Sequence, residues 1–261
     1  MLQSWNKFCF TTGIIEVSLS LPGNGETPGL WPAVWTLGNL GRAGYGATNE
    51  GMWPYTYAAC DFGTFPNQTD RNGVPQEAQT GGNGGGPLSF LPGQRLSACS
   101  CPGSDHPGPN VETGRGNPEI DIIEAQVDVV RRRGETSQSF QVAPYDYQYQ
   151  FNNASPATTV LQGETFLNTY KGGEFQQAVS AVTLLDNNDY GGVGYATYGF
   201  EWWSDSRHRD QGYITWLYNG EPTWRITADS VRGNPTVRIS ERLISEEPHV
   251  STCIDFERAS S

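Results

Sequence analysis

The stretch from Glu119 to Glu124 reads Glu-Ile-Asp-Ile-Ile-Glu, so three acidic residues stand among β-branched apolar ones. Isoleucine fits the pleated surface of a sheet, and the stretch is therefore predicted to be a strand. Successive side chains of a strand point to opposite faces, which puts Glu119 and Asp121 on one face and Glu124 on the other. One extra residue between Asp121 and Glu124, a β-bulge, would turn Glu124 to the shared face. We predict a bulged strand whose three acids line one cleft.

Such a cleft would suit one chemistry in particular. Two carboxyl groups about 5–5.5 Å apart are what retaining glycoside hydrolysis requires. Gathering like charges raises at least one pKa, a cost that the stability of a fold does not require. A solvated acidic strand edge is the other interpretation of these six residues. The preceding Gly114, Gly116 and Pro118 and the abundance of tryptophan favour catalysis.

The composition indicates a single all-β domain. The 261 residues include 32 glycines and 17 prolines, which punctuate short strands and long loops. Alternating or β-branched patterns predict strands at residues 13–21, 30–37, 118–130, 137–143, 195–203, 213–218 and 223–226, and more weakly at 159–167. Residues 38–118 read as one long irregular excursion, which in a compact domain is usually functional. We expect an antiparallel sandwich.

Charge and aromatic content narrow the class of partner. A net charge of −12 argues against nucleic acid and anionic membrane surfaces, which need basic patches. Eight tryptophans are more than the core of such a domain needs, and flat rings match the apolar faces of sugars. The chain has no apolar run long enough to cross a membrane and no signal-peptide pattern at its start.

Several longer motifs give the chain a family resemblance. They read GLWPAVWT at 29–36, GNLGRAGYG at 38–46, MWPY at 52–55, SACSCPG at 97–103, DHPGP at 105–109, YGFEW at 198–202 and GYITW at 212–216. With the acid stretch, they resemble glycoside hydrolase family 16. More narrowly, they resemble its fungal Kre6/Skn1-type branch, which is associated with β-1,6-glucan synthesis. The similarity runs from about residue 4 to about residue 248.

The resemblance implies a fold and an activity. The fold would be a concanavalin A-like jelly roll over residues 1–261, truncated at its start, atypical from about residue 249, and lacking edge strands at both ends. The activity would be that of a retaining hydrolase or transglycosylase without a cofactor. Glu119 would be the nucleophile, Asp121 its helper and Glu124 the general acid/base. The substrate-binding candidates are Trp31, Trp35, Tyr198, Trp202 and Trp216.

The resemblance also implies a location. The relatives are type II membrane proteins, so an anchor is expected upstream of this chain, in the secretory pathway or at the cell surface. That compartment permits disulfides, and Cys60 is expected to pair with Cys99 or Cys101. Zinc is disfavoured by the Cys-x-Cys spacing and the scattered histidines. Asn67 and Asn153 begin glycosylation triplets.

One rival function stays open. A catalytically inactive glucan-binding or scaffold protein of cell-wall assembly would also carry the aromatic residues. It would not need the acid triplet. Linkage preference and the choice between hydrolysis and transfer are open at this level as well.

Overall fold

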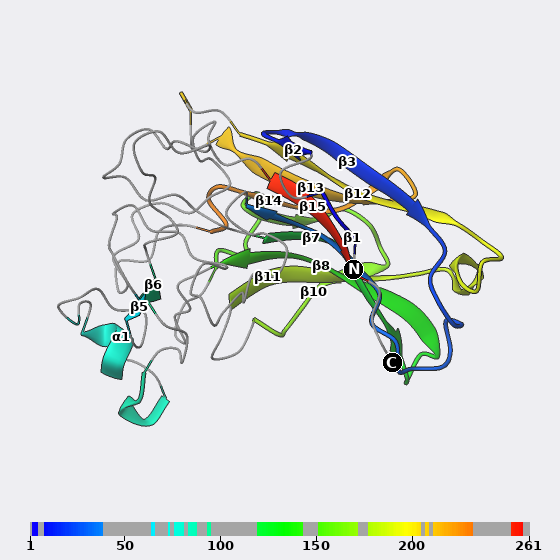
Figure 1. Ribbon diagram of the computed structural model, residues 1–261, viewed down its shortest axis with the longest axis horizontal. Coiled ribbons are helices and arrows are strands. Elements are labelled where there is room, and N and C mark those ends of the chain that lie inside the picture. The colour runs from blue at the N-terminus through cyan, green and yellow to red at the C-terminus, as the bar shows by residue number, and fades with distance from the viewer. Residues whose placement is uncertain are drawn as a thin grey trace.

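The computed structural model describes residues 2–4, 8–38, 64–65, 73, 76–80, 83–87, 93–94, 119–142, 151–171, 177–204, 207–208, 211–231 and 252–257. These residues form two antiparallel sheets that pack into a β-sandwich, the predicted fold class (Figure 1). A two-stranded sheet of β5 (Thr64–Phe65) and β6 (Gly93–Gln94) lies to one side, next to the single-turn helix α1 (Glu77–Thr80). Two 3-10 turns are also described, Asn83–Gly85 and Asn187–Asp189.

The larger sheet has eight strands in the order β1, β15, β4, β7, β8, β11 and β10, with β2 also paired to β15. Their bounds are β1 Leu2–Gln3, β2 Cys9–Phe10, β4 Ala33–Gly38, β7 Glu119–Asp128, β8 Arg133–Val142, β10 Thr165–Leu167, β11 Gln177–Leu184 and β15 Thr252–Glu257. The acid stretch opens β7, which lies between β4 and β8 well inside the sheet.

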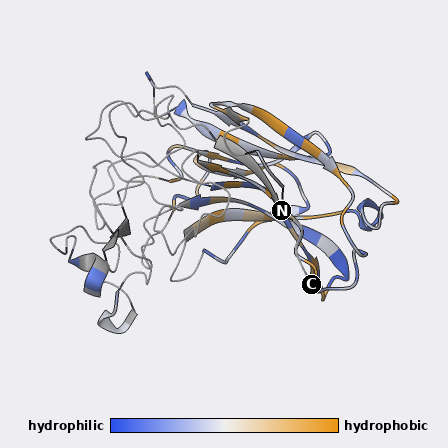
Figure 2. Cartoon of the chain, in the orientation of Figure 1, coloured by the Kyte–Doolittle hydropathy of each residue, from blue (hydrophilic) through white to orange (hydrophobic). Residues whose placement is uncertain are grey.

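The smaller sheet has five strands in the order β3, β12, β13, β14 and β9. Their bounds are β3 Gly13–Leu19, β9 Thr158–Val160, β12 Ala196–Trp203, β13 Tyr213–Tyr218 and β14 Glu221–Thr227. The alternation that predicted these strands sets which face they bury, and Figure 2 shows hydrophobic segments along the strands of both sheets.

Aromatic side chains fill the space between the sheets. Every second residue of β12 and β13 is buried, which brings Phe200 and Trp216 against the isoleucines of β7. Trp216 also stacks on Trp224 of β14 with ring centroids 4.3 Å apart. Each large side chain that is fully buried contributes about 1.5–3 kcal/mol to folding, so these rows hold the two sheets together.

Three segments differ from the sequence-based expectation. Residues 159–167, weakly predicted as one strand, are divided between β9 of the smaller sheet and β10 of the larger sheet. Gln177–Leu184 forms β11, although no strand was predicted there. The tail, which was expected to leave a sheet edge open, supplies β15 instead, and β15 pairs with β4 along its whole length. The prediction that this side of the sheet lacks a strand was therefore wrong. Within the described residues, no helix is long and apolar enough to cross a membrane.

Candidate active site

The predicted bulge is present in β7. Asp121 pairs with Ser139 of β8 and Glu124 pairs with Ser137, so Ile122 and Ile123 together oppose the single residue Gln138. The same shift occurs against β4, where Asp121 pairs with Trp35 and Ile123 with Val34. Ile122 is thus the extra residue. Both isoleucines are buried, and the side chains of Glu119, Asp121 and Glu124 share the face that points away from the smaller sheet. We call this face the acid face.

Asp121 is the centre of the acid face. Its side chain is 1% exposed. Ser139 donates its hydroxyl to Oδ2 of Asp121, and the Gln141 amide donates to the same oxygen at 2.9 Å. Burial raises the pKa of Asp121, and hydrogen bonds with Glu119, Ser139, Gln141 and Glu124 oppose that rise. The carboxyl group therefore lies between the two glutamates and contacts both.

Glu124 has the properties of a proton donor. Burial raises its pKa to about 8, and the charge of Asp121 adds to the rise. The Trp31 indole donates to Oε1 of Glu124 at 3.4 Å and partly opposes the shift. A carboxyl group with this pKa holds its proton at neutral pH, as a general acid must. The two glutamates thus differ in environment, since Glu119 pairs with Leu37 and Gln141 at the other end of the acid stretch.

Two of the predicted substrate-binding aromatic residues lie at this site. Trp31 precedes β4, is 47% exposed and contacts Glu124 directly. Trp35 is the register partner of Asp121 on β4 and is half-buried on the acid face. Together they border the acids on the β4 side.

Three others do not lie there. Tyr198, Trp202 and Trp216 are at most 4% exposed and point between the sheets from β12 and β13. The prediction that they line the substrate site was wrong. Alternation along a strand identifies two faces, but it does not say which one meets solvent when aromatic residues occur on both.

Three polar residues of the acid face were not predicted. Ser139 and Gln141 on β8 bond Asp121, and Ser180 on β11 is the register partner of Ser139. Oε1 of Gln141, Oγ of Ser180 and Oδ1 of Asp121 are buried, and they are among the described atoms that lack a hydrogen-bond partner. Serine and glutamine carry no sequence signal of their own. Only the register of β8 and β11 against the acid strand identifies them.

Some predictions fall outside the described residues, namely those for Cys60, Cys99, Cys101 and Asn67. Asn153 is described and exposed, beside a cis bond between Ser155 and Pro156. In the described part of the chain, no three histidine, cysteine, aspartate or glutamate side chains are placed to hold a metal ion.

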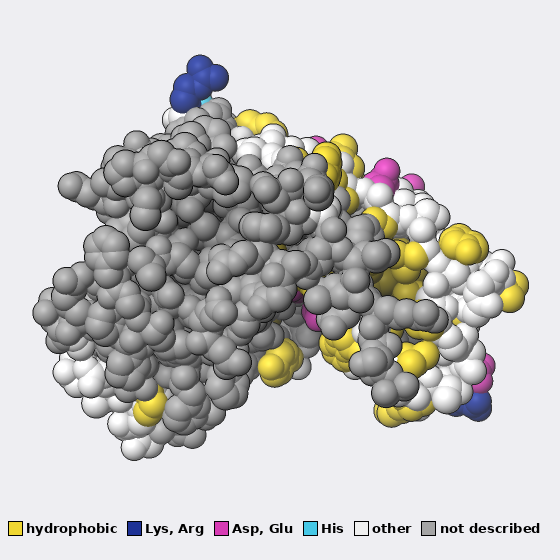
Figure 3. All heavy atoms as spheres, in the orientation of Figure 1, with side chains coloured by type: hydrophobic (Ala, Val, Ile, Leu, Met, Phe, Trp, Pro, Cys, Tyr) yellow, Lys and Arg dark blue, Asp and Glu magenta, His cyan; other side chains and the backbone are white. Residues whose placement is uncertain are grey.

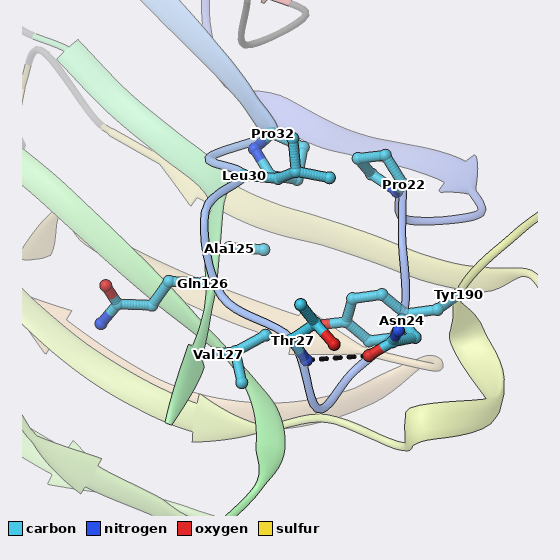
Figure 4. A pocket seen from close by; sticks show the side chains of 9 residues that line it. All are labelled: Pro22, Asn24, Thr27, Leu30, Pro32, Ala125, Gln126, Val127 and Tyr190. Atoms are coloured by element: carbon cyan, nitrogen blue, oxygen red, sulfur yellow. Dashed lines mark hydrogen bonds between the residues drawn. The ribbon is translucent and has the colours of Figure 1, made fainter. Parts of the chain in front are cut away.

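A small pocket lies further along β7. It is enclosed by the loop before β4, by Ala125 to Val127 and by Tyr190, and its volume of about 10 Å³ suits about one water molecule (Figure 4). A sugar ring does not fit there, so the acid face remains the candidate site. Figure 3 shows that basic side chains lie only at the margins of the described surface on the side in view.

Comparison with known proteins supports the resemblance to the fungal Kre6/Skn1-type proteins. The chain is 44% identical over 257 residues to the beta-glucan synthesis-associated protein KRE6 of Saccharomyces cerevisiae, covering 95% of this chain and 32% of that protein. It is 44% identical over 256 residues to SKN1 of the same yeast, covering 95% of this chain and 30% of the relative. The chain is 42% identical over 260 residues to SKN1 of Candida albicans, covering 98% of this chain and 32% of the relative.

The chain thus spans about a third of the length of these relatives. No solved structure matches it at a significant level. Residues 1–257 match the family described as beta-glucan synthesis-associated protein SKN1/KRE6/Sbg1. With this match and the identities above, the chain belongs to the SKN1/KRE6/Sbg1 family of beta-glucan synthesis-associated proteins.

Proposed function

We propose that this chain is a retaining β-glucan hydrolase or transglycosylase of the glycoside hydrolase family 16 type, acting in fungal cell-wall β-1,6-glucan synthesis and remodelling. One observation carries the proposal. A bulge brings Glu119, Asp121 and Glu124 to one face, and both glutamates influence the pKa of Asp121. Three carboxyl groups gathered on one face of one strand are what the short spacing of a retaining enzyme needs.

The roles follow from the environments of the acids. Glu119 attacks the anomeric carbon of the sugar while Glu124 gives its proton to the leaving oxygen, which breaks the glycosidic bond and leaves a glycosyl ester on Glu119. Glu124 then takes a proton from water or from a hydroxyl of a second glucan. The oxygen of that molecule bonds to the anomeric carbon, and the ester bond to Glu119 breaks. Asp121 orients both glutamates and keeps the pKa of Glu124 high through its charge.

The substrate class rests on the relatives and on the acid face. The relatives are named for β-glucan synthesis, which supports a β-glucan as the substrate. The proposed place of action is the secretory pathway or the cell surface. Trp31 is exposed beside Glu124 and offers an indole face to a sugar ring. Gln141 and Ser180 add an acceptor and a hydroxyl beneath the acid face that are buried and unused among the described atoms.

A glucan-binding or scaffold role without catalysis is the second candidate. It is favoured by the depth of the polar groups, because Asp121, Gln141 and Ser180 are each at most 5% exposed. A binding protein could keep such a network for shape alone. The two functions differ in whether a covalent intermediate forms.

Covalent trapping separates them. A 2-fluoro-glucoside with a good leaving group slows the second step more than the first, so the glycosyl ester should accumulate and intact mass should rise by one sugar. Peptide mapping should place the label on Glu119. Glu119→Gln should abolish labelling and leave glucan binding nearly intact. The matched control is Glu135→Gln, which alters a β8 carboxylate bonded to Gln126, away from the triad. Glucan binding without any label would support the scaffold role instead.

Product analysis addresses linkage and acceptor. Incubation with defined β-1,3- and β-1,6-linked oligosaccharides, followed by sizing, gives shorter products for hydrolysis and both shorter and longer products for transfer. The linkage of any longer product then identifies the bond that is formed.

A further inference from the structure

The bulge of β7 accepts hydrogen bonds from side chains in the core, in addition to the backbone hydrogen bonds within its own sheet. A strand carbonyl ordinarily lies in the plane of the sheet and pairs with the next strand. The carbonyl of Asp121 instead accepts a hydrogen bond from Nε1 of Trp216, at 2.8 Å. Trp216 belongs to β13 of the opposite sheet. The peptide that follows the central acid is thus turned toward the core and bonded there.

A second contact holds the next peptide. Nε2 of Gln138 donates to the carbonyl of Ile122, the extra residue of the bulge, at 3.4 Å, and to the carbonyl of Leu217 on β13 at 3.3 Å. Gln138 is the single β8 residue opposite the bulge, and its side chain is fully buried. The amide therefore bridges the bulge to the opposite sheet.

Hydroxyl groups fix the orientation of that amide. Oε1 of Gln138 accepts from Thr223 of β14 at 2.7 Å and from Thr183 of β11 at 3.4 Å. The flipped orientation would set Oε1 against the carbonyls of Ile122 and Leu217 and lose both of those hydrogen bonds. A network of buried polar groups that is satisfied in this way rigidifies the element that it contacts.

We propose that Trp216 and Gln138 are positioning residues, which hold the bulge from the core and so keep Asp121 and Glu124 aligned on the acid face. The proposal rests on the function proposed above for the acids. Neither side chain touches the substrate. Each acts through a hydrogen bond to a backbone carbonyl of β7, on the core side of the strand.

The chain provides a matched pair of variants. Trp216 and Trp224 are both fully buried and stack with planes 10° apart, but Nε1 of Trp224 has no hydrogen-bond partner among the described atoms. Trp216→Phe and Trp224→Phe therefore remove the same ring atoms from the same stack. Only the first removes a bond to the acid strand.

Two readouts distinguish positioning from general loss of packing. Turnover of a β-glucan oligosaccharide should fall by about 10- to 100-fold in kcat for Trp216→Phe, with KM within about twofold, because small displacements of reacting groups cost rate more than binding. The Glu124 carboxyl, followed by ¹³C NMR titration and assigned with Glu124→Gln, should titrate at lower pH in Trp216→Phe as it gains solvent. Trp224→Phe should change neither quantity.

The titration needs no turnover, so the two proposals fail separately. If the parent chain has no activity but only Trp216→Phe lowers the pKa of Glu124, the positioning role stands and the enzymatic function falls. Equal behaviour of the two tryptophan variants, or an unchanged pKa in both, overturns the positioning role. If Trp216→Phe does not fold, Gln138→Met removes the second contact and must show the same two changes.

Discussion

Three carboxyl groups within one stretch of β7 experience different environments, and Glu124 illustrates the consequence for pH. Its pKa is about 8 in the folded chain against an ordinary value of 4.5, so the folded state keeps a proton that the unfolded state has released between these values. Because the folded state binds more protons in that window, the free energy of unfolding should fall as pH rises from about 4.5 to about 8. Asp121, whose pKa is also raised, acts in the same direction.

Urea unfolding at pH 5, 6, 7 and 8 tests this expectation. Glu124→Gln mimics the protonated group and should flatten the pH dependence. Turnover should decline above about pH 8, as Glu124 loses the proton that it donates. A stability that is level across the range in the parent chain would contradict the assignment.

At Ser180, one substitution is expected to raise the stability of the fold and to weaken glucan binding. Its hydroxyl is buried and lacks a partner among the described atoms, which costs about 1–3 kcal/mol. Ser180→Ala should therefore raise the melting temperature and, if the hydroxyl meets a sugar, weaken glucan binding measured by calorimetry.

A bonded hydroxyl on the same strand is the control for that change. Thr183 Oγ1 lies 2.9 Å from Thr165 Oγ1, so Thr183→Val should lower the melting temperature. A substitution at Ser180 that weakens binding only by damaging the fold would lower both quantities together. That result would remove Ser180 from the proposed glucan site.

The strands differ in how well the sequence predicted them. The acid strand and its bulge were predictable because β-branched residues set the strand, and three acids on one face required an extra residue. β11 was missed because Ala178, Ser180 and Ala181 are small and give no alternation of large apolar and polar residues. β15 was missed because the tail was expected to be atypical, although the family match extends through residue 257. Its pairing with β4 also depends on contacts far apart in the chain.

The sequence also did not show which face of the sheet each aromatic residue occupies. Trp35 and Trp216 both lie on central strands, one on the acid face and one in the core. Period-two patterns assign each to a face without saying what covers that face. The register of neighbouring strands supplies this information, and it becomes available only with the fold.

Strand β8 begins with a close contact that yields a test of packing. A Cβ added at Gly134 would lie 2.0 Å from the hydroxyl and 2.7 Å from Cζ of Tyr190, whose ring is buried. Gly134→Ala should therefore destabilise the fold by about 1–3 kcal/mol, measured by urea unfolding.

Removing the Tyr190 hydroxyl should reduce the loss of stability that Gly134→Ala causes. Tyr190→Phe alone should be neutral or slightly stabilising, because that buried hydroxyl has no partner within the described structure. In the double variant the loss should be smaller than in Gly134→Ala. Strictly additive effects would show that the ring moves away freely.

Over the whole molecule, the larger sheet depends on residues at both ends of the chain. β15 lies between β1 and β4, and β4 in turn flanks the acid strand. A chain that ends at residue 251 lacks β15 and leaves β4 with an open edge, which invites pairing between molecules. We expect it to lose cooperative thermal unfolding and to aggregate, as followed by circular dichroism and light scattering.

A chain that ends at Glu257 keeps β15 and is the control for that truncation. It should melt as the parent chain does. If the shorter chain also melts cooperatively and stays monomeric, β15 is dispensable for the sheet and contributes little to the acid face.

The place of β15 in the sheet has a consequence for how a cell makes this protein. A ribosome releases β4 first, then the acid strand β7 and much later β15, so β4 waits for its second neighbour while the residues between them are made. Pairing between segments so far apart in the chain is slow, and until it occurs the unpaired edge can pair with other chains and aggregate. The nascent chain therefore needs its β4 edge shielded until β15 has been made.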